Sequence, residues 1–313
     1  MRKIYLLVSF FALSLLGACD SEELIQPTEK EDGKQEEQQE TVDSLWQEEE
    51  DIFNAPRTRR KEIALDEGQK VINEKLNTFS WNLFTKTFDN KKGTNLLLSP
   101  FSLTQNLMML SNGLRGQSLE EIKLAFGLSE FEMEDMNRYS LQLNKGLEEA
   151  DSRTKYRTDN SIWYRNDMII QPDFAENVSQ YYHAETFPAA MNEETLDSIN
   201  NWAYQRTYGR IKDFLPSLSP DMASVLINTV YFRGLWYYET SDIKYRIFHN
   251  ENGKEETVKF AKLGGRSLYS ENSMYQAACE FFGNRAFAMD FILPKEGADP
   301  TSALKQYIED GVP

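Results

Sequence analysis

The sequence predicts an α+β protein in which helices come first and strands follow. Segments with helical periodicity predominate up to about residue 208, with short strands between them, and strand-like runs dominate after it. Residues 223–238, ASVLINTVYFRGLWYY, form a long run with almost no charge, which predicts a strand that is buried on both faces or lies in mid-sheet. The globular part, residues 64–313, is long enough for one sizeable core.

The first half of the globular part predicts a series of helices. Apolar residues recur at helical spacing in residues 66–89, and a short strand is expected at residues 95–98. The next helix has strong start signals, because Ser99 suits the N-cap and Pro100 suits the first helical position. Gly113 is expected to end that helix in the left-handed conformation.

Local signals also place the helices that follow. Ser118 and Glu121 have the spacing of a capping box, for a short helix that ends at Gly127. Thr195 is expected to cap a later helix that stops at Gly209. Further helices are expected at residues 131–150, 172–183 and 302–309.

The strands are predicted from runs of β-branched and aromatic residues. The pair Asn252-Gly253 marks a tight hairpin between two of them. The predicted strands are residues 159–164, 184–191, 223–238, 248–251, 255–260, 273–282 and 287–294.

The N-terminus has the pattern of an exported lipoprotein. Residues 1–18 combine a basic start with an apolar core at Ile4–Leu16, which is too short to span a bilayer comfortably. The sequence LGAC ending at Cys19 resembles the bacterial lipobox, so we expect residues 1–18 to be removed and Cys19 to carry a lipid in the outer membrane. The acidic residues just after Cys19 are similar to the signal that sends lipoproteins to the cell surface in Bacteroides-like bacteria. An ordinary secretory signal followed by a chance cysteine is the alternative.

Residues 19–63 are expected to form a tether between the lipid and the globular part. Within residues 20–51 the chain has 14 acidic and two basic residues, a net charge of −12 out of −16 for the whole chain. Such a segment buries too little apolar surface to fold, and its charges repel one another. A calcium-binding acidic tail is the functional alternative. The remainder is only mildly acidic and shows no basic face, so no nucleic-acid partner is predicted.

Residue types and motifs for catalysis are scarce. The chain has two histidines, His183 and His249, and it lacks a GxSxG elbow, an HExxH motif, paired CxxC motifs and a phosphate-binding loop. We therefore predict no cofactor and no metal site, and we do not expect an enzyme. Cys279 lies in an apolar run without a partner cysteine, so we expect a buried small hydrophobic residue and no disulfide.

Several segments, taken together in their order and spacing, resemble the serpin family. The resemblance runs from Phe79 to Pro294, and the segment from Asn228 to Trp236 is similar to the family's NxxYFKGxW signature, with Arg233 in the place of the lysine. The segments are NLLLSPFSL, LSNGLRGQSLEEI, NSIWYRND, PDFAENVSQYYHAETF, INNWAYQRTYGRIKDFLP, VLINTVYFRGLWYY and GNRAFAMDFILPKEG. The resemblance implies the serpin fold, with large mixed and antiparallel sheets and a cluster of helices.

The resemblance also implies roles for four residues. Ser99 and Ser102 match the two serines of the "shutter", where central strands of the main sheet part, and Asn228 matches the asparagine on the neighbouring strand. Trp236 matches the tryptophan of the "breach", where an inserting loop first enters. Small polar side chains suit this place, because they exchange hydrogen-bond partners more easily than interlocked aliphatic groups unpack. The alternative is that Ser99 is only a helix cap.

The implied activity is inhibition of serine or cysteine proteases by a suicide-substrate mechanism. A protease cleaves the reactive loop, is acylated, and is carried along as the loop inserts into the main sheet. Family members continue beyond the point that matches Pro313, and that part holds the reactive loop, its hinge and the shutter histidine. We therefore expect a serpin domain at residues 64–313 that lacks its C-terminal third, and a chain that by itself is inactive. The stretches YYETSD and FAKLGG depart from the family pattern and put local packing in doubt.

Three other interpretations stay open at this point. The first is a non-inhibitory serpin-like surface protein that acts as a receptor or carrier. The second is a decayed gene whose product has no activity. The third is an enzyme that gathers His183 or His249 with a nucleophile. The sequence leaves the target protease open, since specificity would reside in the reactive loop.

Overall fold

A computed structural model describes residues 52–91, 95–249 and 253–311, so the signal peptide and Cys19 lie outside the described residues. The helices are α2 (Glu67–Asn90), α3 (Pro100–Ser111), α4 (Gln117–Phe126), α5 (Met133–Glu148), α6 (Pro172–Tyr182), α7 (Glu193–Arg206) and α8 (Pro300–Glu309). The strands are β1 (Thr154–Arg165), β2 (Glu185–Ala189), β3 (Ser224–Gly234), β4 (Thr240–His249), β5 (Glu255–Leu263), β6 (Leu268–Glu271), β7 (Tyr275–Phe281) and β8 (Ala288–Pro294). The mixture of helices and sheets confirms the α+β class.

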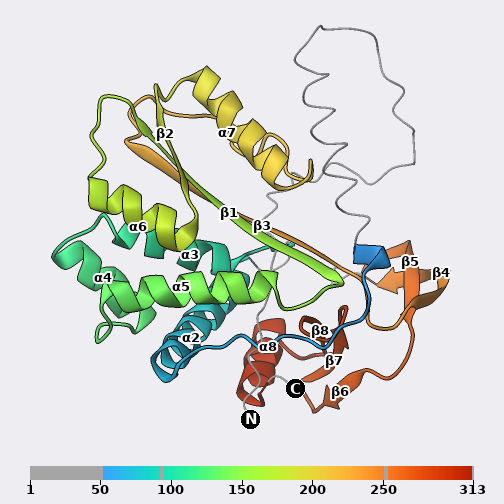
Figure 1. Ribbon diagram of the computed structural model, residues 1–313. Coiled ribbons are helices and arrows are strands. Elements are labelled where there is room, and N and C mark those ends of the chain that lie inside the picture. Colours follow the sequence, from blue (N-terminus) through green and yellow to red (C-terminus); the bar gives the residue numbers. More distant parts are fainter. Residues whose placement is uncertain (1–51, 92–94, 250–252, 312–313) are drawn as a thin grey trace, which may run out of the picture.

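The centre of the molecule is a three-stranded sheet with the order β2-β1-β3 (Figure 1). β1 and β2 run parallel, with α6 as the connection between them, and β1 and β3 run antiparallel with Asn160 directly opposite Asn228. Because side chains alternate along a strand, neighbouring residues of β1 enter different cores. Ile162 belongs to the core shared with α3, α5 and α6, whereas Trp163 belongs to the core shared with α7.

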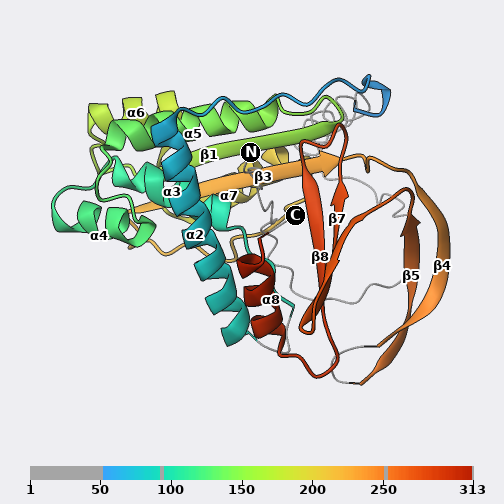
Figure 2. The ribbon, with the colours of Figure 1, turned by 90° about the horizontal axis from the view of Figure 1, so that it is seen from below.

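The remaining strands form two smaller sheets beside this centre (Figure 2). β6, β7 and β8 make an antiparallel sheet on which α8 packs, through Tyr307 against Tyr275. β4 and β5 form a two-stranded arm whose side chains are largely exposed. His249 pairs with Glu255, which confirms the hairpin, although Asn252 lies outside the described residues.

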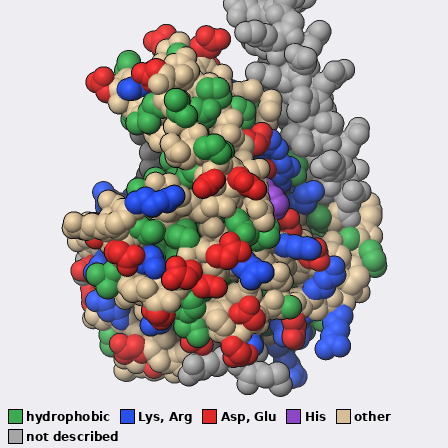
Figure 3. Space-filling model, turned by 60° about the vertical axis from the view of Figure 1, so that its left-hand side comes forward, with side chains coloured by type: hydrophobic (Ala, Val, Ile, Leu, Met, Phe, Trp, Pro, Cys, Tyr) green, Lys and Arg blue, Asp and Glu red, His purple; other side chains and the backbone are tan. Residues whose placement is uncertain are grey.

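The surface carries no concentration of one charge on the face shown in Figure 3, where acidic and basic side chains are interspersed. Among the described helices, none combines the length and the hydropathy that a membrane span requires. Cys279 is buried, as predicted.

Several predicted helix ends are wrong, and competing local signals explain why. α4 starts at Gly116, which has φ 58°, so Ser118 lies inside the helix and makes no capping box. α7 is capped by Asn192, whose side chain accepts a hydrogen bond from the backbone N–H of Thr195. Asn192 and Thr195 are both good capping residues, and the earlier one begins the helix. The C-cap of α3 is Asn112 in the right-handed conformation, so Gly113 does not supply a left-handed end.

Several strand predictions also differ from the structure: β1 and β4 begin earlier than expected, and β6 was not predicted. Residues 95–98 form no strand, because no described strand pairs with them. β3 ends at Gly234, and among the described strands it pairs only with β1. Of the two alternatives predicted for this run, the position in mid-sheet is wrong for the described residues, where one edge of β3 carries no neighbour. Burial on both faces is confirmed in the middle of β3, because Ile227 and Val230 are buried in the cores on opposite faces of the sheet.

Candidate functional site

Ser99 and Ser102 form a buried pair at the start of α3. Ser99 has an extended backbone and caps the helix, since its side-chain oxygen accepts a hydrogen bond from the N–H of Ser102 at 3.2 Å. Its hydroxyl also donates to the hydroxyl of Ser102 at 2.9 Å. The two side chains are 2% and 7% exposed, so the pair holds its hydrogen bonds away from water. Ser99 therefore caps α3, as the alternative interpretation expected. Ser102 adds a second buried hydroxyl, which does not cap the helix.

Asn228 ties β3 to β1 in the middle of the sheet. Its side-chain amide donates to Thr158 Oγ1 at 2.9 Å and to Asn160 Oδ1 at 2.8 Å. The face of the sheet that carries Asn228 also carries Val230, which belongs to the core with α3. The carbonyl oxygen Asn228 Oδ1 is buried and has no hydrogen-bond donor among the described residues. Asn228 therefore keeps one acceptor on β3 without a donor among the described residues.

The polar contacts continue from Asn228 into the helices. Asn160 donates from its amide to the backbone carbonyl of Tyr182, the last residue of α6, at 2.8 Å. The Tyr182 hydroxyl donates to Asn137 Oδ1 at 2.8 Å, and Asn137 and Asn112 exchange two amide hydrogen bonds. Burial raises the pKa of the Tyr182 hydroxyl, so it stays a donor. A continuous buried chain therefore joins α3 and α5 to β1 and β3.

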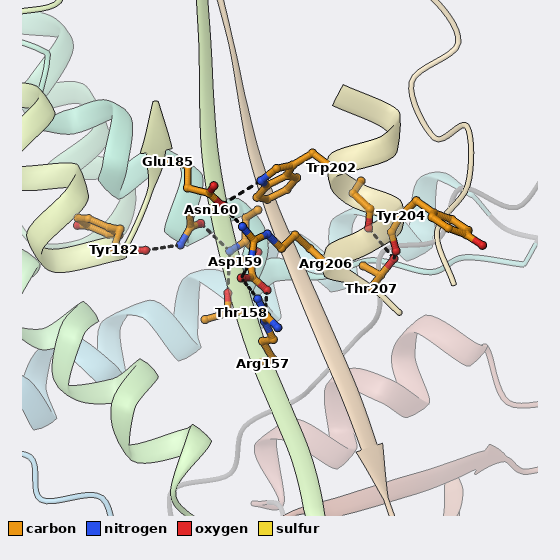
Figure 4. Close-up of polar contacts among 12 residues, drawn as sticks. Arg157, Thr158, Asp159, Asn160, Tyr182, Glu185, Trp202, Tyr204, Arg206 and Thr207 are labelled. Carbon is orange, nitrogen blue, oxygen red and sulfur yellow. Dashed lines mark hydrogen bonds and ion pairs between the residues drawn. The ribbon is translucent and has the colours of Figure 1, made fainter. Parts of the chain in front are cut away.

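A second polar cluster fastens the end of α7 to the opposite face of the sheet (Figure 4). Arg206 contacts Glu185 of β2 at 2.5 Å and Asp159 of β1 at 3.7 Å. The indole N–H of Trp202 donates to the same Glu185 oxygen at 3.1 Å. Arg157 binds both oxygens of Asp159, at 2.6 and 2.8 Å. α7 is thus held to β1 and β2 by charged groups as well as by its apolar face.

Two ionisable groups near this cluster have altered pKa values. Burial by itself would lower the pKa of Arg157, but the hydrogen bond and the charge of Asp159 raise it overall. Burial raises the pKa of Glu148, and the nearby His183 partly opposes that rise.

Trp236 lies at the other end of β3, where the central sheet meets the β7–β8 hairpin. It forms an isolated antiparallel bridge with Phe282, and the two rings stack with their centroids 4.2 Å apart. The backbone N–H of Tyr237 donates to the carbonyl of Phe281 at 2.8 Å, and that of Gly283 donates to Leu235 at 2.7 Å. Trp236 therefore packs at the junction of two sheets.

The structure brings the predicted residues together only in part. α3, which begins with Ser99 and Ser102, packs against β3, which carries Asn228. The hydrogen bonds among described residues join the serines to each other and Asn228 to β1, and they do not join the two groups. Trp236 lies beyond the last residue of β3, outside this cluster.

The two histidines lie on different elements of the described part of the chain. His183 is an exposed residue that ends α6, and His249 lies 3.2 Å from the carboxylate of Glu255 on the exposed arm. Among the residues described, no three His, Cys, Asp or Glu side chains are placed to hold a metal ion.

Comparison with known proteins decides the family. A family model described as Serpin (serine protease inhibitor) matches residues 74–311. The chain belongs to the serpin family. This confirms the resemblance, and it places the pair Ser99–Ser102, Asn228 and Trp236 inside the matched span.

Relatives and solved structures agree with this assignment. An uncharacterized serpin-like protein of Thermococcus kodakarensis is 27% identical over 252 residues, or 79% of this chain and 58% of that protein. Alpha-1-antitrypsin of Meriones unguiculatus is 28% identical, over 72% of this chain and 58% of its own length. The crystal structure of the thermophilic serpin Tengpin in the native state is 28% identical with a TM-score of 0.69, covering 82% of this chain and 65% of that one. The serpin fold is thereby confirmed, and this chain spans a little over half the length of the curated relatives.

Serpins are in general non-enzymatic inhibitors that target proteases. Within this serpin, sequence analysis missed Thr158 and Asn160 as partners of Asn228, and Tyr182 as the partner of Asn160. Asn160 lies in the strand-like run DNSIWY, where a buried amide must find partners, so the same argument that singled out Asn228 could have found it. No sequence pattern pointed to the contact between Arg206 and Glu185.

Proposed function

We propose that the protein to which this chain belongs inhibits a serine or cysteine protease by accepting a cleaved loop as a new strand beside β3. The proposal follows the general activity of the family. The observation that carries it is the combination of an edge of β3 that has no neighbour among the described strands and the buried oxygen of Asn228 on the same strand, which has no donor among the described residues. An exposed strand edge offers a row of hydrogen-bonding groups to an added strand.

The unsatisfied oxygen gives an added strand a specific energetic advantage. A buried acceptor without a donor costs about 1–3 kcal/mol. A strand that enters beside β3 with a polar side chain opposite Asn228 satisfies this acceptor, while Thr158 and Asn160 keep β3 attached to β1. Insertion then lowers the free energy without breaking the bonds that hold the sheet together.

Ser99, Ser102 and Trp236 take supporting roles in this proposal. The two hydroxyls lie buried at the start of the helix that packs on β3, where they can exchange partners as the strand moves. Trp236 closes the end of the sheet by stacking on Phe282, and it has to shift when a strand enters there.

The proposal also includes attachment to the outer surface of the cell. The lipobox-like sequence before Cys19 supports a lipid on that residue, and residues 20–51 support a charged tether. We infer that the globular part acts as an inhibitor at the surface and has no enzymatic activity of its own.

The decisive experiment uses the complete gene product and a panel of serine and cysteine proteases. We expect an SDS-resistant covalent complex with at least one of them, since the trapped protease remains acylated. If every protease only cleaves the protein or leaves it intact, the inhibitory function is wrong and a non-inhibitory surface-binding serpin becomes the better interpretation.

The anchor needs a separate measurement. A Cys19→Ser variant should lose lipid labelling and leave the membrane fraction, while protease trapping in solution should be unchanged. Membrane association that survives this substitution would contradict the lipid anchor.

A further inference from the structure

A basic segment connects the N-terminal part of the chain to α2. We call residues 55–65 the strap, and they form neither helix nor strand. They run from beside the start of β1 towards α2 (Figures 1 and 2). Four of the five residues from Arg57 to Lys61 are basic, and all five are exposed. Only five uncharged residues separate them from residues 20–51, which have a net charge of −12, so the sign of the charge changes over a short stretch.

Three of the four cations are engaged with the folded domain. Arg57 donates to the backbone carbonyl of Tyr237 at 2.8 Å, and its guanidinium lies over the Tyr237 ring at 4.9 Å. Arg60 donates to the carbonyl of Arg285 at 3.3 Å. Lys61 lies 3.3 Å from the carboxylate of Glu149.

Arg59 differs from its neighbours. It is exposed, and its side chain makes no hydrogen bond or ion pair with the described part of the chain. Between Pro56 and Lys61 no backbone group of the strap bonds to another described residue. The flanking bonds are from Ser152 Oγ to the carbonyl of Pro56 and from the N–H of Lys61 to Ala150.

This pattern of contacts leaves the peptide bond after Arg59 as the one in the strap that a protease can cut most easily. A protease binds several residues of its substrate in an extended form and inserts the side chain before the cleaved bond into a pocket. Arg59 offers a free cationic side chain, and only a few exposed contacts around it have to open. Cleavage after Arg57, Arg60 or Lys61 requires first breaking a contact that its own side chain makes.

We propose that the strap is a processing site at which an arginine-specific endopeptidase hydrolyses the peptide bond between Arg59 and Arg60. One water molecule is consumed: the C–N bond breaks, Arg59 gains a carboxylate, and Arg60 gains an amino group that is protonated at neutral pH. The downstream product keeps the ion pair of Lys61, the buried side chain of Leu65 and the capping box of Asp66 on α2. The folded domain therefore survives the cut.

The cut separates residues 1–59 from the domain. The upstream piece is then held by Arg57, by the contact of Phe53 with Arg233 at 5.1 Å, and by the buried side chain of Ile52. Release of the domain from a membrane is a consequence that rests on the proposed lipid at Cys19, whereas the cleavage itself does not depend on it.

Limited proteolysis of the purified chain tests the site. At a low concentration of an arginine-specific endopeptidase, the first product identified by mass spectrometry and N-terminal sequencing should begin at Arg60. Arg59→Gln should slow this first cut at least about tenfold, because the pocket of such an enzyme recognises the cation. The Arg59→Lys variant should also resist the arginine-specific enzyme. Trypsin, which accepts lysine as well as arginine, should still cut this variant after position 59.

Arg266→Gln is the matched control, since Arg266 is also exposed in a segment without helix or strand and the change in charge is the same. It should leave the rate of the first cut within about twofold. A first cut in any other segment, or an Arg59→Gln variant that is cut as fast as the parent, would overturn the proposal. If the purified chain is cut after Arg59 but the cellular protein is never found in membranes, the anchor is wrong and the processing site stands.

Discussion

Asn228 shows how a single amide can link two strands and still keep part of its bonding capacity unused. Its N–H groups hold Thr158 and Asn160, which lie 70 and 68 residues earlier in the chain. Its oxygen remains buried without a donor among the described residues. The N–H groups of the Asn228 amide thus have hydrogen-bond partners, whereas its oxygen has none among the described residues.

Asn228→Ala should destabilise the protein by about 1–3 kcal/mol, because Asn160 and Thr158 lose their donor inside the sheet. The free energy of unfolding from urea denaturation measures the effect. Asn166→Ala is the control, since Asn166 is exposed in the turn after β1, and it should change stability by less than about 0.5 kcal/mol. Equal effects of the two substitutions would contradict the role of the Asn228 side chain.

Glu148 gives the second prediction at the scale of the residue. Burial raises its pKa above 4.5 in the folded state, so the unfolded chain loses the proton first as the pH rises. Ionised Glu148 therefore destabilises the fold at pH values above its folded pKa, and the penalty is absent below pH 4.5. Glu148→Gln should raise the free energy of unfolding at neutral pH and have no such effect in acid, as followed by denaturation at a series of pH values. A gain that is the same at every pH would refute this assignment, and Glu130→Gln, at an exposed position in the turn before α5, is the control.

Among the elements, α7 is held by two different means. Its apolar face packs Ile199 and Trp202 against Trp163 and Ile227, while Arg206 fastens its last turn to Glu185. A cation in the last turn also suits the helix dipole. The apolar contacts set the position of α7 on the sheet. The charged contacts add a contribution to the free energy of unfolding that depends on the salt concentration.

A double-mutant cycle on Arg206→Gln and Glu185→Gln should give a coupling energy of about 0.5 kcal/mol at low salt, because both side chains are partly exposed. The glutamine at position 185 keeps an oxygen for Trp202, so the cycle isolates the charge. The coupling should shrink in 1 M salt, where the Debye length is about 3 Å. Strictly additive single variants, or a coupling that does not change with salt, would show that the charges of Arg206 and Glu185 do not stabilise the fold through each other.

The elements that could be predicted from sequence are those with local signals. Ser99 and Pro100 mark the start of α3 correctly, and Gly127 ends α4 with φ 71° as expected. The cap of α7 could not be chosen, since both Asn192 and Thr195 fit the same pattern. The network around Asn228 was out of reach, because its partners come from elements far apart in sequence and only the fold brings them together. The unsatisfied oxygen of Asn228 is likewise a property of its surroundings in space.

At the scale of the whole molecule, one compact centre is joined to more open parts. The centre holds the two cores on either side of the β2-β1-β3 sheet, and Trp236 links it to the β7–β8 hairpin. The β4–β5 arm is different, because Tyr245 and Ile247 are 67% and 55% exposed on the same face, and Ile243, in the irregular part of the ladder, is 66% exposed. Large apolar side chains exposed together on a strand favour association with other chains.

We therefore expect this chain to self-associate through the β4–β5 arm. Ile247→Lys should raise the concentration at which association begins by about tenfold or more. It should not lower the free energy of unfolding. Analytical ultracentrifugation measures the association, and Ile227→Lys at a position that is 6% exposed is the control that should unfold the protein. Association that persists unchanged in Ile247→Lys would place the contact elsewhere.

The pairing of β1 with β3 also bears on the order in which the protein is made. Thr158 and Asn228 are 70 residues apart, and translation proceeds at about 5–20 residues per second. β1 therefore leaves the ribosome several seconds before its antiparallel partner exists, and during that time only the short β2 can join it. Slowing the decoding of the codons between these two strands should prolong the interval in which the nascent sheet is open to wrong partners.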